Sequence, residues 1–338
     1  MKFSTSLLFA SVLSAGLLVG CDGGSGTSQP AQKTAAEAPK AAPVVIYTNA
    51  DEEAQQAMKN ALDKNGLQGA YLMQSFGTSE LGGKLVAEGK NIEADVVTIS
   101  TYYLESMQKS QKLFRDLGIK LDTVGPAVSY YAPILGNCGA LFVNTEVLKA
   151  DNLPRPAAIA DLAKPEYAGH ISVPDIMGSS TSWLMTQAMI SAKGEQEGSA
   201  IIRAIEKNAG AHLEKSGSGP LKKIRAGEAA VGFGLRHQAV ADKAKGLPID
   251  YVDPVEGNFT LVEAAAVVDK GDKTNPNAEK VVETIVKFGR QELLKFYPVV
   301  LYKGETVSAE NKPANPKTFS EPLTVELLQK HQKLVKGE

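Results

Sequence analysis

The sequence contains little cysteine and no excess of either charge. Only two cysteines occur among its 338 residues, Cys21 and Cys138, and if Cys21 is used in processing the mature chain has no internal disulfide. The 36 Lys and Arg residues are balanced by 38 Asp and Glu residues, so the chain lacks the basic excess that binds nucleic acid. An apolar content of 43% excludes a wholly disordered chain. We therefore expect a folded protein of about two domains that does not bind nucleic acid.

Patterns that would indicate a metal or catalytic site are also scarce. The four histidines show no pair at metal-ligand spacing, and a single remaining cysteine cannot build a thiolate site. Residues 106–109 match Ser-x-x-Lys, but the motifs that accompany it in acyl-transfer enzymes are missing. Residues 82–84, Gly-Gly-Lys, lack the spacing of a nucleotide-binding loop. We therefore expect no metal, no cofactor and no enzymatic activity.

The N-terminus has the features of a processing signal. Lys2 precedes an apolar stretch at residues 7–20, which is too short for a comfortable membrane span but typical of a secretory signal. Residues 18–21, Leu-Val-Gly-Cys, resemble a bacterial lipobox, which implies cleavage before Cys21 and acylation of that cysteine. We predict a signal peptide at 1–20 and a lipidated cysteine with a flexible tether at 21–43. The acyl chains would anchor the protein to the extracytoplasmic face of the cell membrane.

After the tether, strand-like and helix-like segments alternate. Apolar residues at 44–47, 71–73 and 94–99 predict buried strands, and helical patterns follow the first two. Right-handed crossovers bring the carboxyl ends of such strands and the N-termini of the following helices to one sheet edge, where anions bind. The hydroxyl and amide side chains at this edge are candidate ligand-binding residues. They are Thr48, Asn49, Thr78, Ser79, Ser100 and Thr101.

The middle of the chain repeats this pattern. A predicted strand at 171–174 leads into a hydroxyl-rich turn at 178–182, and a second such turn at 216–220 precedes another helix. A strand at 229–233 is followed by Arg236 and His237. The candidate residues that the two turns add are Ser179, Ser180, Thr181, Ser216 and Ser218.

Seven short motifs, taken in order, resemble the extracellular solute-binding proteins of ABC importers, most closely the ferric-iron, phosphonate and sugar-phosphate branch. They lie at 44–49, 77–81, 94–96, 141–145, 178–180, 216–220 and 227–232. The resemblance implies an α/β fold of the type II periplasmic binding protein class, with two lobes, a hinge and a ligand in the inter-lobe cleft. It also implies a monomer that works with the permease and ATPase subunits of an importer.

The resemblance also predicts where the two lobes begin and end. Lobe 1 is expected at 44–138 plus 254–312, lobe 2 at 139–253, and a C-terminal segment with a helix at 313–338. The chain would therefore cross between the lobes near Cys138 and again near Asp253.

The ligand is predicted from the residues that follow the strand at 229–233. Iron-binding members of the family carry an adjacent tyrosine pair there, whereas this sequence has Gly-Leu-Arg-His at 234–237. The guanidinium of Arg236 is suited to phosphate, phosphonate or carboxylate, so we expect a small oxyanionic solute. Tyr102, His237 and Glu256 complete the candidate site.

Three alternatives remain open. The first is a ferric-iron or iron-complex binding protein of an importer. The second, from another class, is an extracytoplasmic hydrolase, which would need a nucleophile and a base within hydrogen-bond reach. The third is a binding protein that serves a signalling receptor.

Overall fold

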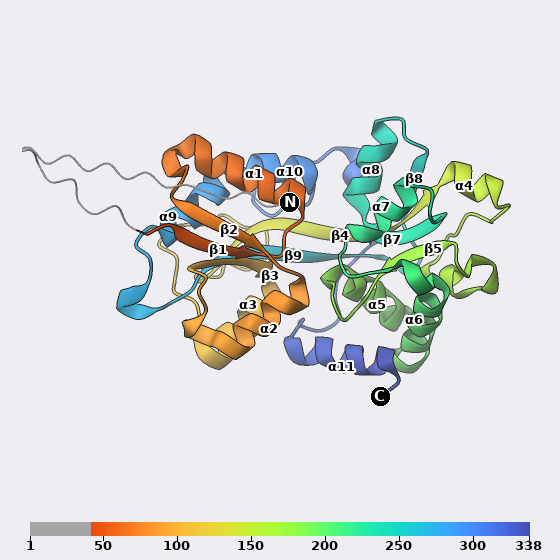
Figure 1. Ribbon diagram of the computed structural model, residues 1–338, viewed down its shortest axis with the longest axis horizontal. Coiled ribbons are helices and arrows are strands. Elements are labelled where there is room, and N and C mark those ends of the chain that lie inside the picture. Colours follow the sequence, from red (N-terminus) through yellow and green to blue (C-terminus); the bar gives the residue numbers. More distant parts are fainter. Residues whose placement is uncertain (1–41) are drawn as a thin grey trace, which may run out of the picture. The chain divides into compact units, whose positions relative to one another are not determined.

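The computed structural model describes residues 42–338 of the chain (Figure 1). The predicted signal peptide, Cys21 and nearly all of the predicted tether lie outside these residues. Within residues 42–338, no helix has both the length and the apolar character needed to span a bilayer.

A ten-stranded mixed sheet carries the fold. Its strand order is β2-β1-β3-β9-β4-β7-β5-β6, with β10 paired to β9 and β8 paired to β4. The strands are β1 (Val44–Thr48), β2 (Tyr71–Ser75), β3 (Val96–Ser100), β4 (Ala132–Asn144), β5 (Ile171–Pro174), β6 (Leu213–Glu214), β7 (Val231–Leu235), β8 (Ile249–Val252), β9 (Asn258–Val267) and β10 (Pro316–Lys317).

Helices cover both faces of the sheet (Figure 1). Helices α1, α7, α8, α9 and α10 lie on one face, and α2, α3, α5, α6 and α11 lie on the other. The helices are α1 (Glu52–Leu62), α2 (Thr78–Glu88), α3 (Thr101–Gln111), α4 (Thr145–Ala150), α5 (Ser180–Lys193), α6 (Glu195–Ala209), α7 (Gly219–Arg225), α8 (Arg236–Ala244), α9 (Ala278–Thr284), α10 (Arg290–Phe296) and α11 (Val325–Lys336).

The parallel strands β1, β2 and β3 explain the apolar runs near the start of the chain. Val44 and Ile46 pack in the core cluster on the α1 side, whereas Tyr47 and Val97 pack in the cluster on the α2 and α3 side. Because helices cover both faces of these strands, successive residues are buried on opposite sides. The polar turns after the strands are therefore left at the sheet edge, next to the helix N-termini.

Strand β4 changes partners along its length. Its first part, through Cys138, pairs with β9, and the part from Gly139 onward pairs with β7 and β8. We call β1, β2, β3, β9 and the first part of β4 the N-terminal half of the sheet, and β5, β6, β7, β8 and the second part of β4 the C-terminal half. The chain returns between β8 and β9, because β9 pairs with β3 and with the first part of β4.

The core on the α2 and α3 side extends under both halves. Tyr102 in α3 and Trp183 in α5 are both buried, and their rings meet edge to face with centroids 4.9 Å apart. Helix α11 also touches both sides, since it packs on α6 while the N–H of Val325 donates to Ser106 Oγ in α3. Apolar contacts and the C-terminal helix therefore join the two halves behind the sheet edge.

Candidate ligand-binding cleft

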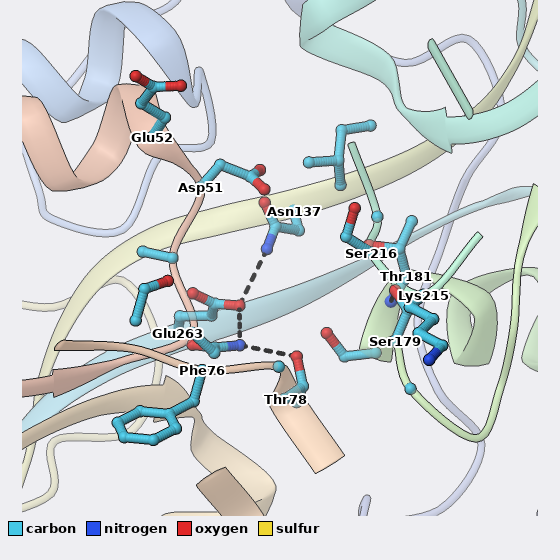
Figure 2. A pocket seen from close by; sticks show the side chains of 18 of the residues that line it. Asp51, Glu52, Phe76, Thr78, Asn137, Ser179, Thr181, Lys215, Ser216 and Glu263 are labelled. Carbon is cyan, nitrogen blue, oxygen red and sulfur yellow. Dashed lines mark hydrogen bonds between the residues drawn. The ribbon is translucent and has the colours of Figure 1, made fainter. Parts of the chain in front are cut away.

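A cavity of about 490 Å³ opens where the two halves of the sheet meet (Figure 2). This is the size of a small-molecule site. Its lining combines residues from the loops that follow β1, β2, β5 and β6 with residues of the crossing strands. The lining residues are Asn49, Ala50, Asp51, Glu52, Gln55, Ser75, Phe76, Gly77, Thr78, Glu80, Leu135, Asn137, Gly178, Ser179, Ser180, Thr181, Lys215, Ser216, Gly217, Leu235, Glu263 and Tyr297.

One side of the cavity is built by the N-terminal half and is dominated by acceptor oxygens. We call Asn49, Asp51, Thr78, Asn137 and Glu263 the acidic wall. The Nδ2 atoms of Asn49 and Asn137 donate to the same Glu263 oxygen, Oε1, at 3.0 and 3.2 Å. Asn49 Nδ2 also donates to Thr78 Oγ1 at 2.9 Å. The two amides therefore hold the Glu263 carboxyl in a fixed position between β3 and β4.

Burial changes the acidity of the two carboxyl groups in this wall. Desolvation, together with a smaller effect of the Asp51 charge, raises the pKa of Glu263 to about 8, against weaker lowering by the Asn49 hydrogen bond. Desolvation also raises the pKa of Asp51 to about 6, where the Ser218 hydroxyl and the Lys222 charge act in the opposite direction. At neutral pH Asp51 is thus largely charged and Glu263 is largely protonated.

The opposite side of the cavity is built by the C-terminal half and is rich in donors. We call Ser179, Ser180, Thr181, Lys215 and Ser216 the hydroxyl wall. Ser179 caps α5, and its Oγ accepts from the N–H of Thr181 at 3.2 Å. Lys215 is exposed, and its ammonium forms no hydrogen bond or ion pair with any residue in the range 42–338. Figure 2 shows this wall across the cavity from Asp51, Asn137 and Glu263.

Gly217 allows the two turns of the hydroxyl wall to lie close together. A Cβ atom at this position would stand 2.0 Å from Thr181 Oγ1, far inside any real contact. Only glycine therefore lets the turn after β6 pack against the first turn of α5. This packing brings Lys215 and Ser216 beside the helix N-terminus.

The first turns of the helices give the two walls opposite electrostatic character. Helix α1 begins with Glu52 and Glu53, and α2 carries Glu80 in its first turn, whereas α5 has no acidic residue in its first turn. Carboxylates near a helix N-terminus neutralise its positive dipole end. The N-terminus of α5 therefore keeps its affinity for an anion, while those of α1 and α2 are already compensated.

The structure brings together part of the predicted site. Six predicted residues line the cleft: Asn49, Thr78, Ser179, Ser180, Thr181 and Ser216. Six others do not line it: Thr48, Ser79, Ser100, Thr101, Tyr102 and Ser218.

The residues outside the lining have structural roles close to it. Thr48 is buried and accepts hydrogen bonds from Thr98 and from the Ala50 N–H. Ser100 precedes α3 and is fully buried, and Tyr102 packs against Trp183. Ser218 precedes α7, and its hydroxyl lowers the pKa of Asp51, which lines the cleft.

The prediction for Arg236 does not agree with its surroundings. Its Nε and Nη2 atoms donate to the two carboxylate oxygens of Asp253 at 2.7 and 3.0 Å, and Nη1 donates to the Glu310 carbonyl at 2.8 Å. The guanidinium also stacks on the Tyr251 ring at 4.5 Å. These partners occupy all three nitrogens of the guanidinium. Arg236 therefore joins the start of α8 to the segments that contain Asp253 and Glu310, and it does not line the cleft.

Glu256 and His237 are also placed elsewhere. The Glu256 carboxylate accepts from the N–H groups of Ile159 and Ala160, so it caps a short helical turn. His237 lines a separate cavity of about 240 Å³, where burial lowers its pKa to about 3. Its ring packs at a tilt against Tyr297, with the centroids 4.5 Å apart, and Tyr297 in turn lines the cleft. We therefore leave Arg236, Glu256 and His237 out of the site.

Sequence reasoning missed Asp51, Asn137, Lys215 and Glu263. Asp51 follows the predicted strand-end residues by two positions, so the same edge argument could have included it. Glu263 offered a clearer signal, because it is a single carboxylate in the otherwise apolar or neutral strand β9. A charged residue inside a buried strand needs partners or a function.

Comparisons with known proteins define the class of protein to which this cleft belongs. The model of the bacterial extracellular solute-binding protein family matches residues 92–318. The chain therefore belongs to the bacterial extracellular solute-binding proteins, which are binding proteins, and the family predicted from the sequence is confirmed.

Two curated relatives match parts of the chain. An Fe(3+)-binding periplasmic protein of Serratia marcescens is 27% identical over 212 residues, which are 60% of this chain and 59% of the relative. An uncharacterized protein of Haemophilus influenzae is 28% identical over 166 residues, 49% of this chain and 46% of the relative. The chain thus spans about half the length of the curated relatives it matches.

A solved structure supports the fold. The periplasmic binding protein AfuA from Actinobacillus pleuropneumoniae, with fructose-6-phosphate bound, matches with a TM-score of 0.70 at 19% sequence identity. The match covers 88% of this chain and 97% of AfuA. The fold is that of the type II periplasmic binding proteins, as predicted.

Proposed function

We propose that this protein is the substrate-binding component of an ABC importer and captures a small solute that bears an oxyanionic group. The observation that carries the proposal is the hydroxyl wall, where the uncompensated N-terminus of α5, four hydroxyl residues and Lys215 border one ligand-sized cavity. Helix N–H groups, hydroxyls and an ammonium are donors suited to phosphate, phosphonate or carboxylate. Arg236 has no part in this site.

Because the chain crosses between the two halves of the sheet, the proposal includes closure of the cleft around the ligand. The acidic wall belongs to lobe 1 and the hydroxyl wall to lobe 2, if the lobes divide where β4 changes partners after Cys138. A ligand that touches both walls favours the closed arrangement over the open one. Release to a permease then requires the hinge to reopen.

Ferric iron is the second candidate, and the cleft supports it less well. Tyr297 is the only tyrosine among the residues that line the cavity, and burial together with the carboxylates of Asp51, Glu53 and Glu263 raises the pKa of its phenol. Ferric tyrosinate ligation needs the deprotonated phenol. The part of the chain that the structure describes also contains no group of three His, Cys, Asp or Glu residues able to hold a metal ion.

Replacing Lys215 with Ala tests the oxyanion site. A thermal-shift screen of phosphonates, sugar phosphates and carboxylates first selects the tightest compound. Loss of a charged hydrogen bond of about 1.5–3 kcal/mol should weaken its binding roughly ten- to a hundredfold by calorimetric titration. Lys207→Ala, an exposed lysine of α6, is the matched control and should bind like the wild type. Equal affinity in the Lys215 variant, or stabilisation by ferric iron and by no oxyanion, would contradict the proposal.

Membrane attachment through Cys21 is part of the same proposal. The lipobox-like residues 18–21 predict acyl chains on Cys21, which would hold the protein at the membrane surface. In cell fractionation we expect wild type in the membrane fraction and Cys21→Ser in the soluble fraction. Cys138→Ser is the control, since it leaves residues 18–21 intact. Identical partition of wild type and Cys21→Ser would rule out the anchor.

A further inference from the structure

The acidic wall contains buried oxygens that have no hydrogen-bond donor. Glu263 Oε2 and Asn137 Oδ1 are fully enclosed and have no partner among the described residues, and the same is true of Asn49 Oδ1. Glu263 is 3% exposed and Asn137 is 8% exposed, and both residues line the cleft. A buried polar atom without a partner costs free energy and indicates an absent partner.

The orientation of the two amides leaves their oxygens without donors. Both Nδ2 atoms already donate to Glu263 Oε1, and both residues line the cleft. Each side-chain amide has its oxygen opposite its nitrogen, so Oδ1 remains unpaired when Nδ2 faces the carboxyl. We call Asn49, Asp51, Asn137 and Glu263 the acceptor cluster.

The charged groups around Glu263 are mostly acidic. The charge of Asp51 raises the pKa of Glu263. The charge of Glu263 in turn raises the pKa of Tyr102 in α3 and of Tyr297 after α10. The charge of Glu53 raises the pKa of Asp51 as well, and the charge of Lys222 lowers it. The cluster thus combines unpaired amide oxygens, the negative charge of Asp51 and a carboxyl group that can ionise, which together are complementary to a cation that carries several N–H donors.

We propose that the acceptor cluster binds a protonated amine of the solute, and that Glu263 gives up its proton to solvent when the amine binds. The inference rests on the proposed function, because it assigns the second pole of the same ligand. An alkylammonium has three N–H donors and no acceptor. The solute is then an amine-bearing oxyanion, with its oxyanion on the hydroxyl wall and its ammonium on the acceptor cluster.

The proton balance of this step is simple. Before binding, the Glu263 carboxyl holds one proton, and the ammonium holds its own in water. On binding, the Glu263 O–H bond breaks and the proton leaves to buffer, while the ammonium keeps its protons and donates to the carboxylate. One proton is released for each ligand bound at a pH where Glu263 starts protonated. A ligand hydroxyl could instead accept from the neutral carboxyl and would release none.

The experiment compares matched compounds on the full chain. Aminoalkylphosphonates of two to four carbons are titrated against hydroxyalkylphosphonates of the same length, at pH 6 and pH 8.5, in buffers of different ionisation enthalpy. The hydroxyl compound controls for titration of the phosphonate itself. We expect the amine compound to release about one proton at pH 6. Its affinity, relative to the hydroxyl compound, should rise roughly thirty- to a hundredfold toward pH 8.5.

Glu263→Gln identifies the group that releases the proton. Gln keeps an oxygen to accept from Asn49 and Asn137 but cannot ionise, so proton release should disappear and the affinity advantage of the amine at pH 8.5 should be lost.

The outcomes separate this inference from the proposed function. Equal binding of both compounds without proton release in the wild type would overturn the amine site and leave the oxyanion site standing. Binding of simple alkylamines as tightly as aminophosphonates would support the acceptor cluster and overturn the oxyanion proposal. Failure of both phosphonate series to bind would count against both.

Discussion

Arg236→Ala should destabilise the fold by about 3–5 kcal/mol, the range found when one partner of a buried ion pair is removed. The Arg236 and Asp253 side chains are only 4% and 9% exposed, and the pair is bidentate. Truncation leaves the Asp253 carboxylate buried with only the Asn258 amide and the Ala314 N–H as donors. It also removes the stacking on Tyr251.

Urea unfolding of the free protein measures this loss. Arg155→Ala is the matched control, because Arg155 pairs with Asp250 at the surface with a side chain 45% exposed. Exposed pairs contribute at most about 1 kcal/mol. Under conditions where it is folded, Arg236→Ala should bind the selected oxyanion within about threefold of the wild type. A stable variant that loses binding by tenfold or more would instead return Arg236 to the binding site.

Glu263 should contribute a loss of stability to the free protein as the pH rises from about 4.5 to about 8. In the unfolded chain a glutamate ionises near its ordinary pKa of 4.5, whereas in the fold burial keeps Glu263 protonated up to about pH 8. The neutral carboxyl therefore contributes stability that is fully present below pH 4.5 and is lost as the pH passes 8. A shift of this size corresponds to a few kcal/mol, on the order of 1.4 kcal/mol per pKa unit.

Glu263→Gln isolates this contribution, because Gln resembles the neutral carboxyl at every pH. Unfolding experiments from pH 4 to pH 9 should give equal stabilities for wild type and variant at pH 4 and a variant that is more stable by a few kcal/mol at pH 9. Glu283→Gln, at an exposed position near the end of α9, should follow the wild type throughout. Parallel curves for wild type and Glu263→Gln would show that the buried carboxyl does not titrate as described.

The strand ends could be predicted from the sequence because they follow local rules. Apolar runs at 44–47 and 171–174 mark strands that are buried on both faces, and polar turns must follow where such strands leave the core. That reasoning placed Asn49, Thr78 and Ser179 correctly at the sheet edge. The same reasoning could not distinguish residues that face the cavity from buried residues such as Thr48 and Ser100. A shift of one position along a turn reverses the direction in which a side chain points.

The remaining parts of the site depend on contacts between distant segments. Arg236 follows β7 directly, but its partners Asp253 and Glu310 lie 17 and 74 positions further along the chain. The carboxyl of Glu263 is held by amides from two other elements, 214 and 126 positions away. Periodicity and turn chemistry contain no information on such pairings. Only the three-dimensional structure shows that Arg236 is paired with Asp253 and that Glu263 lies in the wall of the cleft.

The contact between Trp183 and Tyr102 has a practical consequence. The chain contains one tryptophan, and it lies in the first turn of α5, immediately behind the hydroxyl wall. Its indole N–H donates to His331 of α11 at 2.9 Å, and its ring meets Tyr102 from the other half of the sheet. Any relative movement of the two halves alters the surroundings of this single chromophore. The protein therefore carries a built-in optical probe, and a change in its intrinsic fluorescence on ligand binding would test the proposed closure without a label.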